Sequence, residues 1–221
     1  MRKKLSIVAL LLVGFLSILS FQGVNAADFP VTVVDDLEAE VAMEEKPEKI
    51  ISLSPSNTEM LYSLGLGNRV VGVTTYANYP AEATQNEKIG SVTEPNIEKI
   101  VALEPDLVIA SAVNKKEQVN KLKELGIKVA GFAPSNIEET IITIKKVGKL
   151  TGENFIAKKI TEKMSKQLND IEKLVSEKVK NNEKPKVFYE IWHNPLMTAG
   201  EGTFIDDLIE NAGGKNLGAM A

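Results

Sequence analysis

Short apolar runs alternate with amphipathic segments in the part of the chain that follows Pro47. The runs with the length of strands lie at residues 49–54, 70–75, 88–92, 107–111 and 128–133. They are largely continuous and do not alternate with polar residues, which is typical of strands in a parallel sheet covered by helices on both faces. The pattern predicts a first α/β lobe over residues 47–151.

Helical periodicity fills the intervals between these runs. Ser56 and Glu59, and again Ser135 and Glu138, have the spacing of a capping box, in which each side chain bonds the other residue's free backbone N–H. The predicted helices run from Ser56 to Gly65 or Gly67, over 97–103 and 117–125, and from Ser135 to about Leu150. Strands and helices therefore alternate along most of the first lobe, although no helix is predicted between the runs at 70–75 and 88–92.

A long amphipathic helix is predicted from about Asn154 to Lys180. Its apolar stripe has spacings of three and four residues and consists of Ile156, Ile160, Met164, Leu168, Ile171, Val175 and Val179. At about 1.5 Å per residue this helix spans about 40 Å, which is more than one lobe needs. We therefore expect residues 152–182 to link two lobes.

The remaining residues, 183–221, begin a second α/β lobe. Two strands are predicted at 186–192 and 196–199, and a helix at 203–212 ends at two glycines. These elements are too few to close a core of their own. We expect the second lobe to be incomplete in this chain.

The first 26 residues have the pattern of a secretory signal peptide. A positive start (Met1 to Lys4) precedes an apolar stretch, and Val24 and Ala26 stand where a signal peptidase reads small side chains. The apolar stretch is longer than the usual 7–15 residues or so, which leaves an uncleaved anchor helix as the alternative. Residues 27–46 are acidic and irregular, and we expect a flexible arm there, with one edge strand at 31–34 as the alternative.

Composition then excludes several classes of function. The formal net charge of the 221 residues is −4, which provides no electrostatic footprint for nucleic acid. The chain has no cysteine, so disulfides and thiol nucleophiles are excluded, and a lipid anchor on a cysteine is excluded with them. With the signal peptide, this predicts a periplasmic or otherwise extracytoplasmic protein that is not a lipoprotein.

Candidate chemistry is sparse. The chain has one histidine, His193, so a site with several histidine metal ligands is excluded and a serine–histidine triad has a single candidate base. The segment Gly65-Leu-Gly67 follows a helix and precedes a strand, which is the wrong order for a phosphate-binding loop. Tyr76 and Trp192 each end a predicted strand, and they either clamp a ligand from two sides or simply cover the ends of their sheets.

Several motifs in order resemble the periplasmic binding proteins for cobalamin and iron-siderophores. The resemblance covers residues 47–218, and it is carried by residues 50–59 (IISLSPSNTE), 64–67 (LGLG), 70–80 (VVGVTTYANYP), 95–109 (PNIEKIVALEPDLVI), 125–129 (LGIKV) and 187–200 (VFYEIWHNPLMTAG). It implies two Rossmann-like lobes of parallel sheet flanked by helices, joined by one long rigid helix, with a ligand cleft between them. The motifs of this family continue beyond residue 221.

This resemblance implies a solute-binding component of an ABC importer, which captures a corrinoid or a ferric siderophore and delivers it to a permease. It implies a monomer that is not an enzyme and holds no resident cofactor. Tyr76 matches a ligand-contacting aromatic position, and Trp192, Ser54 and Pro55 complete the expected ligand-binding set. Glu98 matches the glutamate that docks on the permease.

The family pattern also has departures here. Val92 occupies about the place of a tryptophan, and Trp192 the place of a small residue, so the aromatic contacts are rearranged. Two other classes of function stay open. One is an exported hydrolase that uses His193 with a serine, and the other is a surface interaction protein whose cleft has no aromatic side chains.

Overall fold

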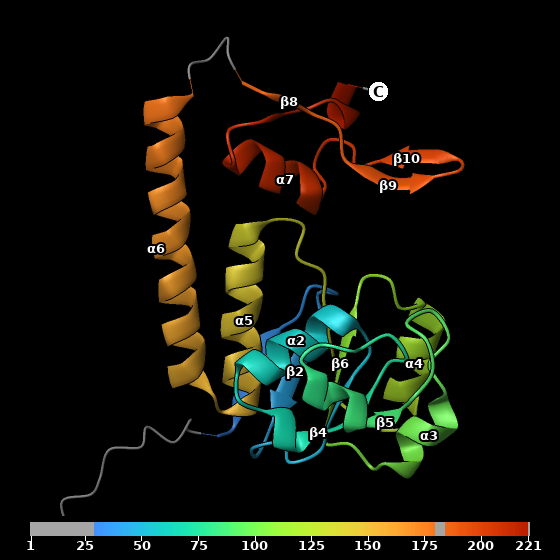
Figure 1. Ribbon diagram of the computed structural model, residues 1–221. Coiled ribbons are helices and arrows are strands. Elements are labelled where there is room, and N and C mark those ends of the chain that lie inside the picture. The colour runs from blue at the N-terminus through green and yellow to red at the C-terminus, as the bar shows by residue number, and fades with distance from the viewer. Residues whose placement is uncertain (1–28, 180–183, 221) are drawn as a thin grey trace, which may run out of the picture.

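A five-stranded parallel sheet forms the centre of the first lobe (Figure 1). The computed structural model describes residues 29–179 and 184–220. The predicted signal peptide at residues 1–26 lies outside these described residues. The strand order is β5-β4-β3-β6-β7, with β3 at Ile50–Ser52, β4 at Val70–Val73, β5 at Glu87–Lys88, β6 at Leu107–Ser111 and β7 at Val129–Phe132. The predicted α/β class is confirmed.

Helices cover both faces of this sheet, as the continuous apolar strands predict. On one face, α2 (Pro55–Ser63) and α5 (Ile137–Thr151) enclose a core that includes Ile50, Leu61, Ile109 and Val147. On the other face, α3 (Ile97–Ala102) and α4 (Lys116–Glu124) enclose a second core that includes Ile51, Ile100, Val108 and Leu122. Successive residues of one strand thus serve opposite cores.

The long helix α6 (Asn154–Lys178) runs beside α5 and continues to the level of the C-terminal elements (Figure 1). Gly152 takes a left-handed conformation (φ 75°) between the two helices, which a glycine adopts without strain. A methyl group at Gly148 would collide with Ala157, so the two helices are in close contact there. Ile156, Ile160 and Met164, from the predicted stripe, pack against the first core.

The N-terminal segment forms a β-hairpin, so the flexible arm predicted over residues 27–46 is wrong for its described part, whereas the edge strand considered at 31–34 is confirmed as β1. Strand β1 (Val31–Val34) pairs antiparallel with β2 (Glu40–Met43). Buried residues alternate with exposed ones in both strands, and the buried set belongs to the first core: Val31, Val33, Val41 and Met43. The acidic composition concealed this alternation.

Asp35, in the turn of this hairpin, is 3% exposed and ties the hairpin to β7. Its Oδ1 accepts hydrogen bonds from the backbone N–H groups of Leu37 at 2.9 Å and Ala39 at 2.8 Å, and its Oδ2 accepts one from Gly131 at 2.9 Å. Buried backbone donors need such partners, so this acid is structural.

The second lobe contains two small sheets and one helix. β8 (Lys186–Val187) pairs parallel with β11 (Lys215–Asn216), and β9 (Glu190–His193) pairs antiparallel with β10 (Leu196–Thr198). The single strand predicted at 186–192 is therefore wrong, because the chain leaves the parallel pair after Val187 and turns into a hairpin. Helix α7 (Phe204–Asn211) packs between these strands and α6 (Figure 1).

Within residues 29–179 and 184–220, no helix combines the length and the apolar character that crossing a membrane requires.

Replacing Asp35 by alanine is expected to destabilise the protein by about 3 kcal/mol, because three backbone donors lose their acceptor. Urea unfolding followed by circular dichroism measures this cost as a lower midpoint with an unchanged slope. Asp36→Ala is the comparison variant, because Asp36 accepts one backbone hydrogen bond, from Ala133 at 2.9 Å, besides its ion pair with Lys146, and its loss should cost about 1 kcal/mol. Equal costs for the two variants would contradict the structural role of Asp35.

Candidate functional site

The carboxyl ends of β3 and β4 bring three of the predicted ligand-binding residues to one edge of the sheet. Ser54 and Pro55 follow β3, and Tyr76 follows β4. The two strands are neighbours in the sheet, with Ser52 opposite Val73 in the parallel register. In open parallel sheets this edge is where ligands bind.

Ser54 caps helix α2, so the predicted capping box from Ser56 to Glu59 is wrong. The Ser54 Oγ accepts a hydrogen bond from the backbone N–H of Asn57 at 3.2 Å, and Pro55 occupies the first turn, which suits a residue without an N–H. Ser56 Oγ lies 3.1 Å from Ser54 Oγ, so the two hydroxyls form a hydrogen bond with each other. Ser54 is 3% exposed, so its hydroxyl positions the helix.

Two buried asparagines at this edge were missed by the sequence reasoning. Asn57 Nδ2 donates to the carbonyls of Ile109 at 3.3 Å and Ala110 at 3.1 Å. Asn114 Nδ2 donates to the carbonyls of Leu53 at 3.1 Å and Val92 at 2.7 Å. These amides join the ends of β3 and β6 to the loops beyond them. Asn114 follows an apolar pair directly, which was its only signal, whereas Asn57 lies inside a predicted helix and had none.

Tyr76 projects into solvent, with 72% of its surface exposed. Tyr79, in the same loop, is 66% exposed, and the sequence reasoning did not select it. Most large aromatic side chains gain free energy from burial, so two exposed tyrosines in one loop form a surface that a ligand could cover.

Trp192 lies in the β9–β10 hairpin of the second lobe and is 55% exposed. Its indole Nε1 donates to the Asn194 carbonyl at 3.0 Å, and its ring centroid lies 5.2 Å from that of His193. No hydrogen bond joins Trp192 to the first lobe within the described residues. The structure therefore presents Tyr76 and Trp192 on separate lobes.

Glu98 lies in the first turn of α3, at the side of the first lobe away from α5 (Figure 1). Its side chain is exposed, and no ion pair involves it among the residues that the structure describes. Asn96 caps the helix by accepting from the Lys99 N–H at 2.9 Å. A free carboxylate here is available to a cationic partner.

Helix α5 begins beside the same edge of the sheet, one residue later than the predicted capping box. Asn136 is the cap and accepts from the Glu139 N–H at 2.8 Å. Glu139 in turn accepts from the N–H of Ser135 at 2.6 Å and from its hydroxyl at 2.8 Å. The backbone and hydroxyl hydrogen bonds from Ser135 hold the pKa of Glu139 below its ordinary value.

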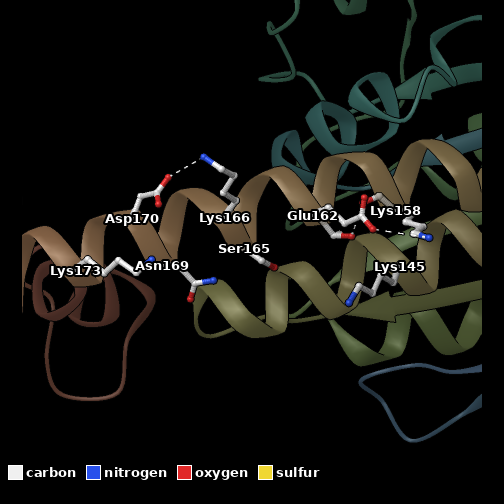
Figure 2. A pocket seen from close by; sticks show the side chains of 9 residues that line it. Lys145, Lys158, Glu162, Ser165, Lys166, Asn169, Asp170 and Lys173 are labelled. Carbon is white, nitrogen blue, oxygen red and sulfur yellow. Dashed lines mark hydrogen bonds and ion pairs between the residues drawn. The ribbon is translucent and has the colours of Figure 1, made fainter.

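A groove of about 590 Å³ lies between α5 and α6, away from the predicted ligand-binding residues (Figure 2). Its lining is polar and includes Lys145, Ser165, Asn169 and Lys173. Two of its lysines pair with acids one turn away, as in Lys166 to Asp170 at 3.1 Å. Such pairs are typical of a solvated helix face. In the described part of the chain, no group of three or more His, Cys, Asp or Glu side chains is placed to hold a metal ion.

The chain belongs to the periplasmic binding protein family, whose model matches residues 50–220. An ABC transporter substrate-binding lipoprotein, YvrC of Bacillus subtilis, is 36% identical over 196 residues, which are 86% of this chain and 62% of that protein. The crystal structure of the periplasmic vitamin B12-binding protein BtuF of Vibrio cholerae has a TM-score of 0.71 and 29% identity, and covers 79% of this chain and 68% of that one. A possible iron-binding solute-binding protein of Staphylococcus epidermidis has a TM-score of 0.65 and 32% identity, with 80% and 69% covered.

The predicted family and fold are thereby confirmed. Members of this family bind small ligands and work with the permease of an ABC transporter. The chain spans 62% of the length of the Bacillus subtilis relative.

The predicted localisation needs correction. The absence of cysteine from the sequence predicted a protein that is not a lipoprotein, whereas the Bacillus subtilis relative is a lipoprotein. Membership of this family does not imply a protein without a lipid anchor, so the expectation is withdrawn.

Replacing Ser54 by alanine is expected to lower the free energy of unfolding by about 1 kcal/mol, since the N-cap is lost. Ser56→Ala is the matched control and should change it by less than about 0.5 kcal/mol. Urea unfolding of both variants measures the difference. A larger cost for Ser56→Ala would restore the capping box that the sequence suggested.

Proposed function

We propose that this protein is the solute-binding component of an ABC importer that captures a corrinoid, with a ferric siderophore as the alternative cargo. The observation that carries the proposal is the pair of exposed aromatic side chains, Tyr76 and Trp192, presented by the two lobes of a chain of this family. The vitamin B12-binding protein of Vibrio cholerae shares this fold, and that similarity favours the corrinoid.

Capture in this proposal needs no chemical step. A corrinoid has a broad, largely apolar ring with polar amide side chains. Aromatic rings contribute much contact area at little cost in conformational entropy, and they suit such a ring. We assign ligand contacts to Tyr76 and Trp192, while Ser54 and Pro55 contribute by fixing the start of α2 at the edge of the sheet.

We further propose that residues 47–151 form one lobe, 152–182 the linker and 183–221 part of the second lobe, and that the protein acts as a monomer. A helical linker implies a small hinge motion on binding. Glu98 is the proposed docking residue for the permease. Its exposed carboxylate, in the first turn of α3, offers an anion to arginines of a partner.

The alternative of a hydrolase is less favoured by the geometry of His193. Its side chain is exposed in β9, and within the described residues no hydrogen bond joins its ring to a serine hydroxyl. A serine–histidine mechanism needs that contact and a third group that orients the base. Ester hydrolysis that disappears in His193→Ala would support the hydrolase instead.

The ligand contacts can be tested directly, because Trp192 is the only tryptophan of the chain. Cyanocobalamin should quench its fluorescence on binding, and titration calorimetry should give the affinity. Tyr76→Ala and Trp192→Ala should each weaken binding about tenfold or more, since a central aromatic contact is lost. Phe155→Ala, which removes an aromatic ring that is 59% exposed on α6, should leave the affinity unchanged.

Haem and a ferric hydroxamate are titrated in parallel as competing cargoes. Tighter binding of the hydroxamate than of cyanocobalamin would make a ferric siderophore the proposed cargo. If all three ligands bind more weakly than about 100 μM, or −5.5 kcal/mol, the capture proposal is contradicted.

Glu98→Lys should leave ligand affinity unchanged and strongly reduce ligand uptake, because it reverses the charge that meets the permease. Uptake of labelled cobalamin by cells that depend on this protein is the measurement. Glu117→Lys is the matched control, because Glu117 is an exposed acid in the first turn of α4, and uptake should stay close to wild type. Loss of ligand affinity in Glu98→Lys, or equal loss of uptake in both variants, would overturn the docking role.

A further inference from the structure

Among the described residues, one hydrogen bond connects the two lobes directly, in addition to the covalent linker α6. Asp207, on α7 of the second lobe, accepts from the backbone N–H of Ile137 at 2.9 Å through its Oδ2. Ile137 is the first residue of α5, in the first lobe, and lies 70 residues away in the sequence. In Figure 1, α7 lies beyond the end at which α5 begins.

This contact has the geometry of a helix cap that is supplied from another lobe. The first N–H groups of a helix have no partner within the helix, and the helix dipole favours an anion at that end. Asn136 already serves the Glu139 N–H, so Asp207 provides the acceptor for a different donor. The Nδ2 of Asn211, one turn on, donates to Asp207 Oδ1 at 3.0 Å. The other carboxylate oxygen of Asp207, Oδ2, is the one that accepts from Ile137.

The neighbouring acid of α7 serves its own lobe. Asp206 Oδ1 accepts from the Asn216 side chain at 2.9 Å, and its Oδ2 accepts from the Gly202 N–H at 2.9 Å. Of these two adjacent carboxylates, Asp206 forms hydrogen bonds within the second lobe, and Asp207 forms one with the first lobe.

A second attachment changes what the linker permits. At its far end, α6 contacts the second lobe where Val175 meets Gly213, and a Cβ at Gly213 would stand 2.9 Å from Val175 Cγ1. If α6 were the only attachment, the second lobe could rotate about the axis of α6 relative to the first lobe. A second contact away from that axis restricts this rotation. Asp207 provides this point, beside the carboxyl edge of the sheet where the predicted ligand contacts lie.

We propose that Asp207 is a positioning residue for ligand capture, which holds the two lobes at one separation by capping α5. The part that concerns affinity rests on the proposed function, whereas the part that concerns the lobes does not. A fixed separation raises the fraction of molecules that are competent to bind, and the apparent affinity follows that fraction.

The separation of the lobes is measurable in the protein as it exists, because the chain has no native cysteine. Spin labels are attached at Asn120→Cys, in α4, and Glu210→Cys, in α7. Pulsed electron paramagnetic resonance then measures the distance between the two labels, one on each lobe. We expect one narrow distribution of distances when Asp207 and Ile137 are unchanged, and a clearly broader one in Asp207→Ala.

The donor is removed by Ile137→Pro. Proline is favoured at the first position of a helix, and the preceding Asn136 is extended (φ −152°, ψ 174°), as a residue before proline prefers. This variant should broaden the distribution as Asp207→Ala does, and the double variant should be no broader than either one. Ile137→Ala, which keeps the N–H, and Asp206→Asn, within the second lobe, should stay narrow.

Asp207→Asn retains an acceptor and should restore most of the narrow distribution. Affinity for cyanocobalamin should fall about two- to tenfold in Asp207→Ala and Ile137→Pro. An unchanged distribution in folded Asp207→Ala or Ile137→Pro overturns the proposal, as does additivity in the double variant. If no ligand binds the unsubstituted protein, the proposed function fails while the distance measurement still decides the role of Asp207.

Discussion

The close contact between α5 and α6 determines where everything beyond the first lobe lies. Gly148 and Ala157 leave no room for a larger side chain between the helices, and Gly152 provides the left-handed turn that folds α6 back along α5. One face of the first half of α6 then packs against the core of the first lobe, through Ile156, Ile160 and Met164. Its second half carries the second lobe through the contact with Gly213. Because a helix resists bending, the position of the second lobe follows from the packing of side chains in the first.

Rigidity and ligand contact are divided between different residues at the edge of the sheet. The buried groups there, Ser54, Asn57 and Asn114, form hydrogen bonds with the backbone and hold the loops in place. The exposed groups, Tyr76 and Trp192, leave most of their surface open, and in the proposed function this surface contacts the ligand. Such a division is expected of a binding protein, in which a preformed surface lowers the entropy cost of capture. Ser54, which was predicted to bind the ligand, is observed as the cap of α2, where its hydroxyl accepts from the Asn57 N–H.

The sequence predicted the first lobe well, because its strands are continuous apolar runs and its helices have clear ends. The predicted strand at 107–111 agrees with β6, and the long helix begins at Asn154 as predicted. The helix starts shifted by one or two residues, since more than one polar side chain near Ser54 and Asn136 is able to cap. In the hairpin at 31–43, the strand at 31–34 was anticipated, whereas its partner at 40–43 was missed because the segment was interpreted from its acidity. Contacts across the fold, such as those of Asn114 and Asp207, leave no periodic signal, and only the tertiary structure brings their partners together.

The hydrogen bond from Gly131 to Asp35 joins residues 96 positions apart, and this separation has a kinetic meaning. The hairpin is the first described part of the chain, yet its docking surface includes β7, the last strand of the sheet to be synthesised. The hairpin has no core of its own and buries its apolar face only when residues up to Phe132 have joined the sheet. The hairpin can therefore reach its native packing only after β7 has been synthesised, so its docking depends on contacts of long sequence separation, which form slowly.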